Sequence, residues 1–208
     1  MAPTNRQTHW EHVYSSKTES EVSWFQTTAT PSMELLTRIG ATPTSAIIDI
    51  GGGASRLVDD LHAQGFENLT VLDLSAAALA TARTRLGSHS DKVAWIVADI
   101  TTWSPPALYD IWHDRAALHF LTQPDEQFAY RERLITALRP GGHAIIGTFA
   151  PNGPETCSGL PVIRHTAQSL SGLLGDEFTL VGQQSHDHLT PWSALQKFQF
   201  SSFQRRNN

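Results

Sequence analysis

Residues 47–55 read IIDIGGGAS, and this stretch decides the fold. Its apolar beginning is typical of a strand that is buried on both faces of a parallel sheet. The three glycines let the backbone bend sharply and let a ligand approach the main chain closely. Apolar residues at helical spacing follow over 55–61. The pattern therefore predicts a strand, a tight turn and a helix whose first N–H groups are free to bind a ligand.

Strand and helix patterns go on alternating over about 100 residues, which predicts a parallel sheet with right-handed crossovers. Strands are predicted at 46–50, 69–74, 93–99, 109–112 and 143–149, and helices at 55–61, after Ser75 and from Pro124. The helix from Pro124 is expected to present Phe128 and Leu134 to the sheet, and residues 140–142 (PGG) are expected to form a turn.

The last quarter of the chain has a different pattern. Two more strands are predicted at 177–184 and 194–204. In the second, Phe198 and Phe200 alternate with polar residues, as in an antiparallel or edge strand. Residues 151–165 are rich in proline and glycine. They predict an ordered loop near the carboxyl ends of the strands, where function usually lies in such sheets.

Length and composition limit the class of protein. The chain has 208 residues, of which 40% are hydrophobic and 17% charged, so one folded domain with additions is expected. The net charge of −5 argues against nucleic acid as a partner. One cysteine excludes an internal disulfide framework. No apolar run approaches the roughly 18 residues of a membrane span and no secretory signal is visible, so a cytoplasmic protein without a membrane partner is predicted.

Two acidic residues stand at the ends of predicted strands. Asp73 ends the second strand, twenty residues after Gly53, and Asp99 ends the third. A carboxylate at the first position can accept two hydrogen bonds from a ribose diol, so the sequence predicts a nucleoside pocket. A dinucleotide site would require a third glycine where Arg56 stands, which disfavours a nicotinamide oxidoreductase.

The glycine turn resembles the first motif of the class I S-adenosylmethionine-dependent methyltransferases, an acidic and an apolar residue followed by G-x-G-x-G. Gly51 and Gly53 match the first two glycines, and Ser55 replaces the third. Further segments between residues 45 and 150 are similar to the later motifs of that family: 71–75 (VLDLS), 98–100 (ADI), 109–114 (YDIWHD) and 138–142 (LRPGG). The resemblance implies a Rossmann-like, doubly wound α/β sheet of seven strands, with an antiparallel last strand and helices on both faces.

S-adenosyl-L-methionine is the cofactor that this resemblance implies. Eight residues match the positions that hold it in the family: Asp49, Gly51, Gly53, Asp73, Leu74, Asp99, Ile100 and Trp112. No spacing of cysteine and histidine suggests a zinc site, so no metal is predicted.

Residues 112–118 (WHDRAAL) look like a segment of the thiopurine, chalcogen and related small-molecule methyltransferases, in which an Asp-Arg pair lies beside the acceptor. Four residues are catalytic candidates on this basis: His113, Asp114, Arg115 and His119. Either histidine could serve as a general base or could be purely structural. Arg115 could bind an anionic substrate or pair with Asp114.

The N-terminal residues 1–43 are predicted to form a helical lid or cap, and 44–208 the methyltransferase domain, with 151–165 as its acceptor-side loop. The pattern W-x-x-x-Y followed by S-W-F resembles the segment before the first motif in several small methyltransferases, including some that act on protein lysines. Five residues are candidates for contact with the substrate: Trp10, Tyr14, Trp24, Phe25 and Cys157. The alternatives are plain packing of the aromatic residues and an inert cysteine.

The preferred hypothesis is an S-adenosylmethionine-dependent methyltransferase that transfers a methyl group to a small-molecule nucleophile by in-line displacement. Sulfur, selenium, nitrogen and oxygen acceptors all remain open. The alternatives are a protein lysine methyltransferase and a non-catalytic S-adenosylmethionine-binding protein. A monomer or a weak homodimer is expected.

Overall fold

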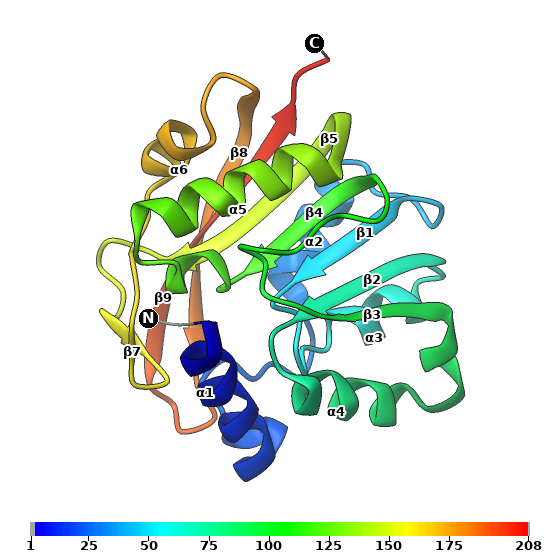
Figure 1. Ribbon diagram of the computed structural model, residues 1–208, viewed down its shortest axis with the longest axis vertical. Helices are drawn as coiled ribbons and strands as arrows, with labels where there is room; N and C mark the ends of the chain where they lie inside the picture. Colours follow the sequence, from blue (N-terminus) through cyan, green and yellow to red (C-terminus); the bar gives the residue numbers. More distant parts are fainter. Residues whose placement is uncertain (1–2, 208) are drawn as a thin grey trace.

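A seven-stranded sheet with helices on both faces forms the body of the molecule (Figure 1). The computed structural model describes residues 3–207, with side chains from residue 6 onward. The sheet strands are β1 (Ala46–Ile50), β2 (Asn68–Asp73), β3 (Val93–Val97), β4 (Tyr109–Arg115), β5 (Leu138–Phe149), β8 (Phe178–Leu189) and β9 (Leu195–Arg205). The helices are α1 (Pro3–Ser16), α2 (Thr30–Arg38), α3 (Leu57–Ala63), α4 (Ala76–Leu86), α5 (Pro124–Ala137) and α6 (Ala167–Leu174), with short 3₁₀ turns η1 (Glu19–Glu21), η2 (Gly87–Lys92) and η3 (Leu118–Phe120).

The order of the strands is β3-β2-β1-β4-β5-β9-β8. The first five run parallel, and β9 lies antiparallel between β5 and β8. The predicted fold, including the antiparallel last strand, is therefore confirmed. β9 is an internal strand, however, and β8 forms the edge of the sheet.

The apolar run of β1 is explained by its two buried faces. Ile47 packs into a cluster with residues of α2 and α3, whereas Ile48 and Ile50 pack into a second cluster with residues of α5 and α6. Alternate residues of a strand point to opposite faces, so a strand covered on both sides must be apolar throughout. Leu35 and Leu36 of α2 belong to the first cluster, although they lie in the predicted N-terminal cap. The division of the chain at residue 43 stays a prediction.

Three local expectations differ from the structure. Phe128 is 60% exposed, and α5 instead buries Tyr130, Leu134 and Ala137, which follow at helical spacing. The predicted turn at 140–142 lies within β5, where Gly141 adopts a φ of +79°. The predicted loop at 151–165 contains a two-stranded ribbon, β6 (Thr156–Cys157) and β7 (Leu160–Pro161).

The carboxyl ends of the parallel strands meet at one edge of the sheet, and α1 lies beside this edge (Figure 1). Ser75 caps α4 there, because its Oγ accepts a hydrogen bond from the Ala78 N–H at 3.1 Å. In the part of the chain that the structure describes, no helix is long and apolar enough to cross a membrane.

Candidate active site

A cavity opens at the carboxyl ends of the parallel strands. One part of it is predicted to hold the nucleoside and is called the nucleoside half. It is lined by residues at or just after the ends of β1, β2 and β3: Gly51, Asp73, Leu74, Ala98, Asp99 and Ile100. The acceptor half of the cavity is lined by residues of α1, the chain around Trp24, and the segments that follow β4 and β5: Trp10, Tyr14, Trp24, Arg115, His119, Phe120, Phe149 and Cys157. Gln196 and Phe198 of β9 complete it.

Asp73 is the buried acid of the nucleoside half. Its Oδ1 accepts a hydrogen bond from the Ser75 N–H at 2.8 Å. Burial raises the pKa of Asp73 to about 7, and the nearby carboxylates of Asp49 and Glu11 act in the same direction. Hydrogen bonds from hydroxyl groups stabilise a carboxylate strongly when it lies in an apolar site. A ribose diol would supply two such groups.

The glycine turn leaves room only for backbone. Gly51 has a φ of +64°, and a Cβ there would lie 2.7 Å from the Ala117 Cβ. Gly53 has a φ of +47°, and a Cβ there would lie 3.0 Å from the Tyr14 Oη and 3.1 Å from an Asp73 oxygen. Side chains at these two positions would therefore be strained, and one at Gly53 would fill the space beside Asp73.

The end of β3 provides the other wall of the nucleoside half. The Oδ1 of Asp99 accepts hydrogen bonds from the Thr101 N–H at 2.8 Å and from its Oγ at 2.7 Å. These bonds fix the bend of the chain after β3. Leu74 and Ile100 add apolar surface on which a flat ring could lie.

Two predicted site residues form a buried link outside the cavity. His113 Nδ1 lies 2.7 Å from the Asp49 Oδ1, and its Nε2 lies 2.8 Å from the Ser32 Oγ. Both ring nitrogens are thus engaged, and neither Asp49 nor His113 lines the cavity. His113 therefore connects β4 to β1 and to α2 through hydrogen bonds. Its position does not support a role as general base.

Asp114 and Trp112 point toward α5, away from the cavity. Asp114 accepts hydrogen bonds from the N–H groups of Ala117 and Leu118 at 2.8 and 3.1 Å, and from the Tyr130 Oη at 2.7 Å. Burial raises the pKa of Asp114 to about 6. Trp112 is fully buried and donates its indole N–H to the Tyr130 Oη at 2.8 Å. These residues shape the segment after β4 and do not face a ligand.

An aromatic cluster covers the acceptor half. Trp10 lies edge-on to Phe120, with ring centroids 4.9 Å apart, and to Trp24 at 5.6 Å. Trp24 donates its indole N–H to the Tyr14 Oη at 3.1 Å. Three of the predicted substrate residues therefore meet in one place. Phe25, by contrast, faces a smaller hollow, where the Arg56 guanidinium lies over its ring at 5.7 Å.

Polar contacts at both edges hold α1 over the cavity. Glu11 accepts hydrogen bonds from the Ser75 Oγ at 2.7 Å and from the Ala77 N–H at 3.2 Å, at the positive end of α4. Arg6 forms an ion pair with Glu126 in the first turn of α5. The helix thus bridges two sides of the cavity.

Sequence reasoning missed Phe120, Phe149, Phe198 and Gln196. Phe149 ends β5, and Phe198 pairs with it in the neighbouring strand β9. Phe149 and Phe198 were visible only as apolar residues in predicted strands, because the order of the strands decides which side chains reach the cavity. Phe120 and Gln196 gave no signal in the sequence.

Residues 47–142 match the protein family described as a methyltransferase domain. This match covers the glycine turn, both strand-end acids and β4, in the strand order described above. By this match, residues 47–142 are a methyltransferase domain.

Curated relatives of the methyltransferase domain include nodulation protein S of Sinorhizobium fredii, 28% identical over 106 residues, which are 51% of this chain and 48% of that protein. Trans-aconitate 2-methyltransferase of Methylobacterium radiotolerans is 35% identical over 114 residues, 54% of this chain and 41% of that protein. The chain spans about half the length of the curated relatives it matches.

The fold also matches a solved structure over nearly its whole length. The N-methyltransferase NodS from Bradyrhizobium japonicum WM9, in complex with S-adenosyl-L-homocysteine, superimposes with a TM-score of 0.71 at 18% identity. The match covers 94% of this chain and 97% of that one. The likeness extends the shared fold well beyond residues 47–142.

Within residues 3–207, no three histidine, cysteine, aspartate or glutamate side chains gather closely enough to hold a metal ion.

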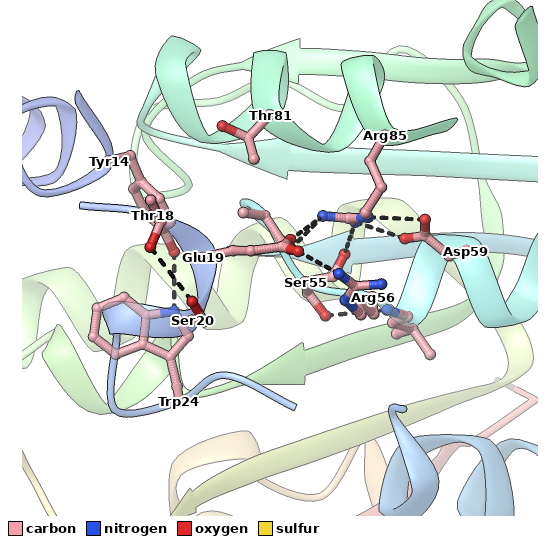
Figure 2. A network of polar contacts seen from close by, with 12 residues as sticks. Tyr14, Thr18, Glu19, Ser20, Trp24, Ser55, Arg56, Asp59, Thr81 and Arg85 are labelled. Carbon is pink, nitrogen blue, oxygen red and sulfur yellow. Dashed lines mark hydrogen bonds and ion pairs between the residues drawn. The ribbon is translucent and has the colours of Figure 1, made fainter. Parts of the chain in front are cut away.

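A network around Arg85 supports the glycine turn of the methyltransferase domain (Figure 2). The guanidinium donates to the carbonyl oxygens of Ala54 and Ser55 at 3.0 and 2.8 Å. It also binds both oxygens of Asp59, at 2.9 and 2.6 Å, and the Glu19 carboxylate at 2.8 Å. Arg85 thereby joins the backbone after the turn to α3 and to the segment that follows α1.

We predict that Arg85→Met loosens the glycine turn, since the backbone carbonyl oxygens of Ala54 and Ser55 lose their donor. The free energy of unfolding should fall by about 1–3 kcal/mol, which lowers the unfolding temperature by about 3–10 °C. Affinity for S-adenosylhomocysteine, measured by calorimetry, should fall about 10-fold. Arg83→Met, an exposed change on the same helix, is the matched control. Equal effects of both substitutions would contradict the supporting role of Arg85.

Proposed function

We propose that this protein is an S-adenosylmethionine-dependent methyltransferase that acts on a small molecule. The observation that carries the proposal is the buried carboxylate of Asp73, which faces a glycine turn with no room for side chains. This pairing lies within a cavity of the methyltransferase domain. The cofactor-bound structure of NodS supports the same choice of cofactor.

The residues of the cavity fit the cofactor. Asp73 would hold the ribose hydroxyl groups, Leu74 and Ile100 would lie against the adenine ring, and Gly51 and Gly53 would admit the amino-acid part beside the backbone. When bound, S-adenosylmethionine supplies a methyl group on a positively charged sulfur, which makes the methyl carbon electrophilic. The protein's own task is then to orient the acceptor and to exclude water.

The acceptor half supports a small molecule over a protein segment. Tyr14 and Trp10 of α1 close one side, and Trp24 and Phe120 close the next. Polar contacts of α1 to α4 and α5 hold this cover in place. An extended peptide would have to displace the cover, whereas a compact acceptor fits beneath it.

The site's histidine is not suited to act as a base. Burial lowers the pKa of His119 to about 3, so its ring is neutral near pH 7 and holds a further proton poorly. Burial also raises the pKa of the Cys157 thiol to about 11, so this side chain stays protonated. These two pKa shifts favour acceptors that are already nucleophilic, without help from His119 or Cys157.

Calorimetry with S-adenosylmethionine, S-adenosylhomocysteine and NADH tests the proposal. We expect the first two to bind with dissociation constants in the micromolar range and NADH not to bind. Incubation with panels of thiols, amines, phenols, carboxylic acids and peptides, followed by mass spectrometry, should then give a methylated small molecule. Binding of NADH alone would refute the proposal, and a methylated peptide without a methylated small molecule would favour a protein substrate.

A further inference from the structure

The acceptor half contains a cation that forms no ion pair with the described residues. Arg115 donates one hydrogen bond from Nη2 to the Trp24 carbonyl oxygen at 3.1 Å, and its guanidinium lies over the Phe198 ring at 5.5 Å. Its Nε is buried and has no hydrogen-bond partner, and Arg115 forms no ion pair with any side chain that the structure describes. Burial lowers the pKa of Arg115 to about 10, which still leaves it charged at neutral pH.

His119 offers a second unpaired donor. Its side chain is fully buried, and its Nδ1 accepts a hydrogen bond from the Phe149 N–H at 3.4 Å. In a neutral ring the proton must then lie on Nε2. This Nε2 is buried and has no hydrogen-bond partner among the described residues. A buried donor left without an acceptor is costly, so a ligand atom is the natural partner.

The walls around these donors are aromatic. The ring of His119 lies 4.9 Å from that of Phe149, which lies 4.8 Å from that of Phe198. Arg115 stands over this last ring, so a chain of ring contacts connects His119 to Arg115. Such walls suit a flat, apolar body.

The acid that acts most strongly on Arg115 is Asp49, which raises the pKa of the guanidinium, but Asp49 does not line the cavity and is bound by His113. The acids that line the cavity form no ion pair with Arg115. Asp73 and Asp99 follow β2 and β3 in the nucleoside half, and each already accepts hydrogen bonds from its own chain. The other cavity cation, Arg6, differs, because it forms an ion pair with Glu126. The acceptor half therefore presents donors and positive charge, which attract an anion and repel an amine cation.

We propose that the acceptor site recognises an organic acid with a flat apolar body, whose carboxylate is bound by the guanidinium of Arg115 and the Nε2–H of His119. The planar fork of arginine matches the two oxygens of a carboxylate. This assignment rests on the proposed function in one respect, the identification of the bound acid as the methyl acceptor. The recognition itself is a property of the cavity.

Paired probes test the recognition without knowledge of the natural acceptor. Benzoate and indole-3-acetate are compared with benzamide and indole-3-acetamide, which have the same shape without the charge. Binding is followed by calorimetry and by quenching of tryptophan fluorescence, with and without saturating S-adenosylhomocysteine. We expect each acid to bind about 10- to 100-fold more tightly than its amide. Equal affinities, or tighter binding of the amides, would overturn the proposal.

Substitutions show which residues cause the tighter binding of acids than of amides. Arg115→Gln should bring the acids down to the affinity of the amides, Arg115→Lys should keep part of the preference, and His119→Phe should reduce it about 10-fold. Arg139→Gln, an exposed change in β5, is the control and should keep the full preference. If Arg115→Gln fails to fold, the lysine variant and the unaltered protein still decide the question. A full preference in Arg115→Lys and His119→Phe alike would overturn the assignment.

The two proposals fail separately. A protein that binds S-adenosylhomocysteine but does not prefer acids would refute the acid site and leave methyl transfer intact. A protein that prefers acids but does not bind S-adenosylhomocysteine would retain the acid site and refute the methyltransferase proposal.

Discussion

Asp73→Asn is expected to weaken the binding of S-adenosylhomocysteine by about 10- to 100-fold, because a charged acceptor of ribose hydrogen bonds becomes a neutral one. The asparagine can keep the bond from the Ser75 N–H, since its Oδ1 remains an acceptor. The loss should therefore concern the ligand and leave the turn before α4 in place. The difference in affinity should be measured by calorimetry at pH 8, where the native carboxylate is ionised.

The same substitution is expected to stabilise the protein without ligand at neutral pH. Burial raises the pKa of Asp73 from 3.8 to about 7 in the folded state. Between these values the unfolded chain loses the proton while the folded protein retains it, so stability falls as the pH rises through this window and stays low above it. Asp73→Asn avoids this loss, which is on the order of a few kcal/mol.

Unfolding temperatures from pH 4 to pH 8 measure this effect. Asp73→Asn should unfold about 5–10 °C above the native protein at pH 8, and the difference should vanish toward pH 4. Asp91→Asn, an exposed change in η2, should show no such dependence. A constant difference across the pH range would contradict the raised pKa of Asp73.

Gly52→Ala is expected to destabilise the protein by about 3 kcal/mol, although Gly52 occupies the variable position of the glycine motif. A Cβ at Gly52 would lie 2.5 Å from the Asp49 Oδ2 and 2.6 Å from a methyl group of Val71. Both neighbours are buried, and Asp49 is held by His113. The added methyl group must therefore displace the core or break this buried pair.

Thermal unfolding and S-adenosylhomocysteine binding test this expectation. The unfolding temperature of Gly52→Ala should fall by about 6–12 °C, and the affinity should fall with it. Gly172→Ala is the control, since a Cβ at this helical position meets nothing within 4 Å. It should be neutral or slightly stabilising. Similar losses in both variants would argue against the crowding at Gly52.

The nucleoside half was the most predictable part of the site. Gly51, Asp73 and Asp99 follow three parallel strands, whose carboxyl ends must meet at one edge of the sheet. Short-range patterns were therefore enough to predict that residues almost 50 positions apart in the sequence lie close together. The cap at Ser75 and the aromatic residues of α1 were likewise visible from local spacing.

The residues after the fourth strand were less predictable. β4 runs to Arg115, three residues beyond its predicted end, so adjacent side chains alternate between its two faces. Trp112 and Asp114 turn toward α5, whereas His113 turns toward α2. A sequence motif does not distinguish these directions. Four consecutive residues were therefore all predicted to belong to the site, whereas only Arg115 lines the cavity.

The sequence by itself determined the class of the sheet, the antiparallel last strand and the nucleoside half, because these depend on hydrophobic periodicity and on turns of a few residues. Only the tertiary structure decided the chemistry of the acceptor half. The insertion of β9 beside β5 brings Phe198 next to Phe149, and the burial of Arg115 and His119 leaves both with unpaired donors. Pairing and solvation depend on neighbours that are distant along the chain, so no local pattern could reveal them.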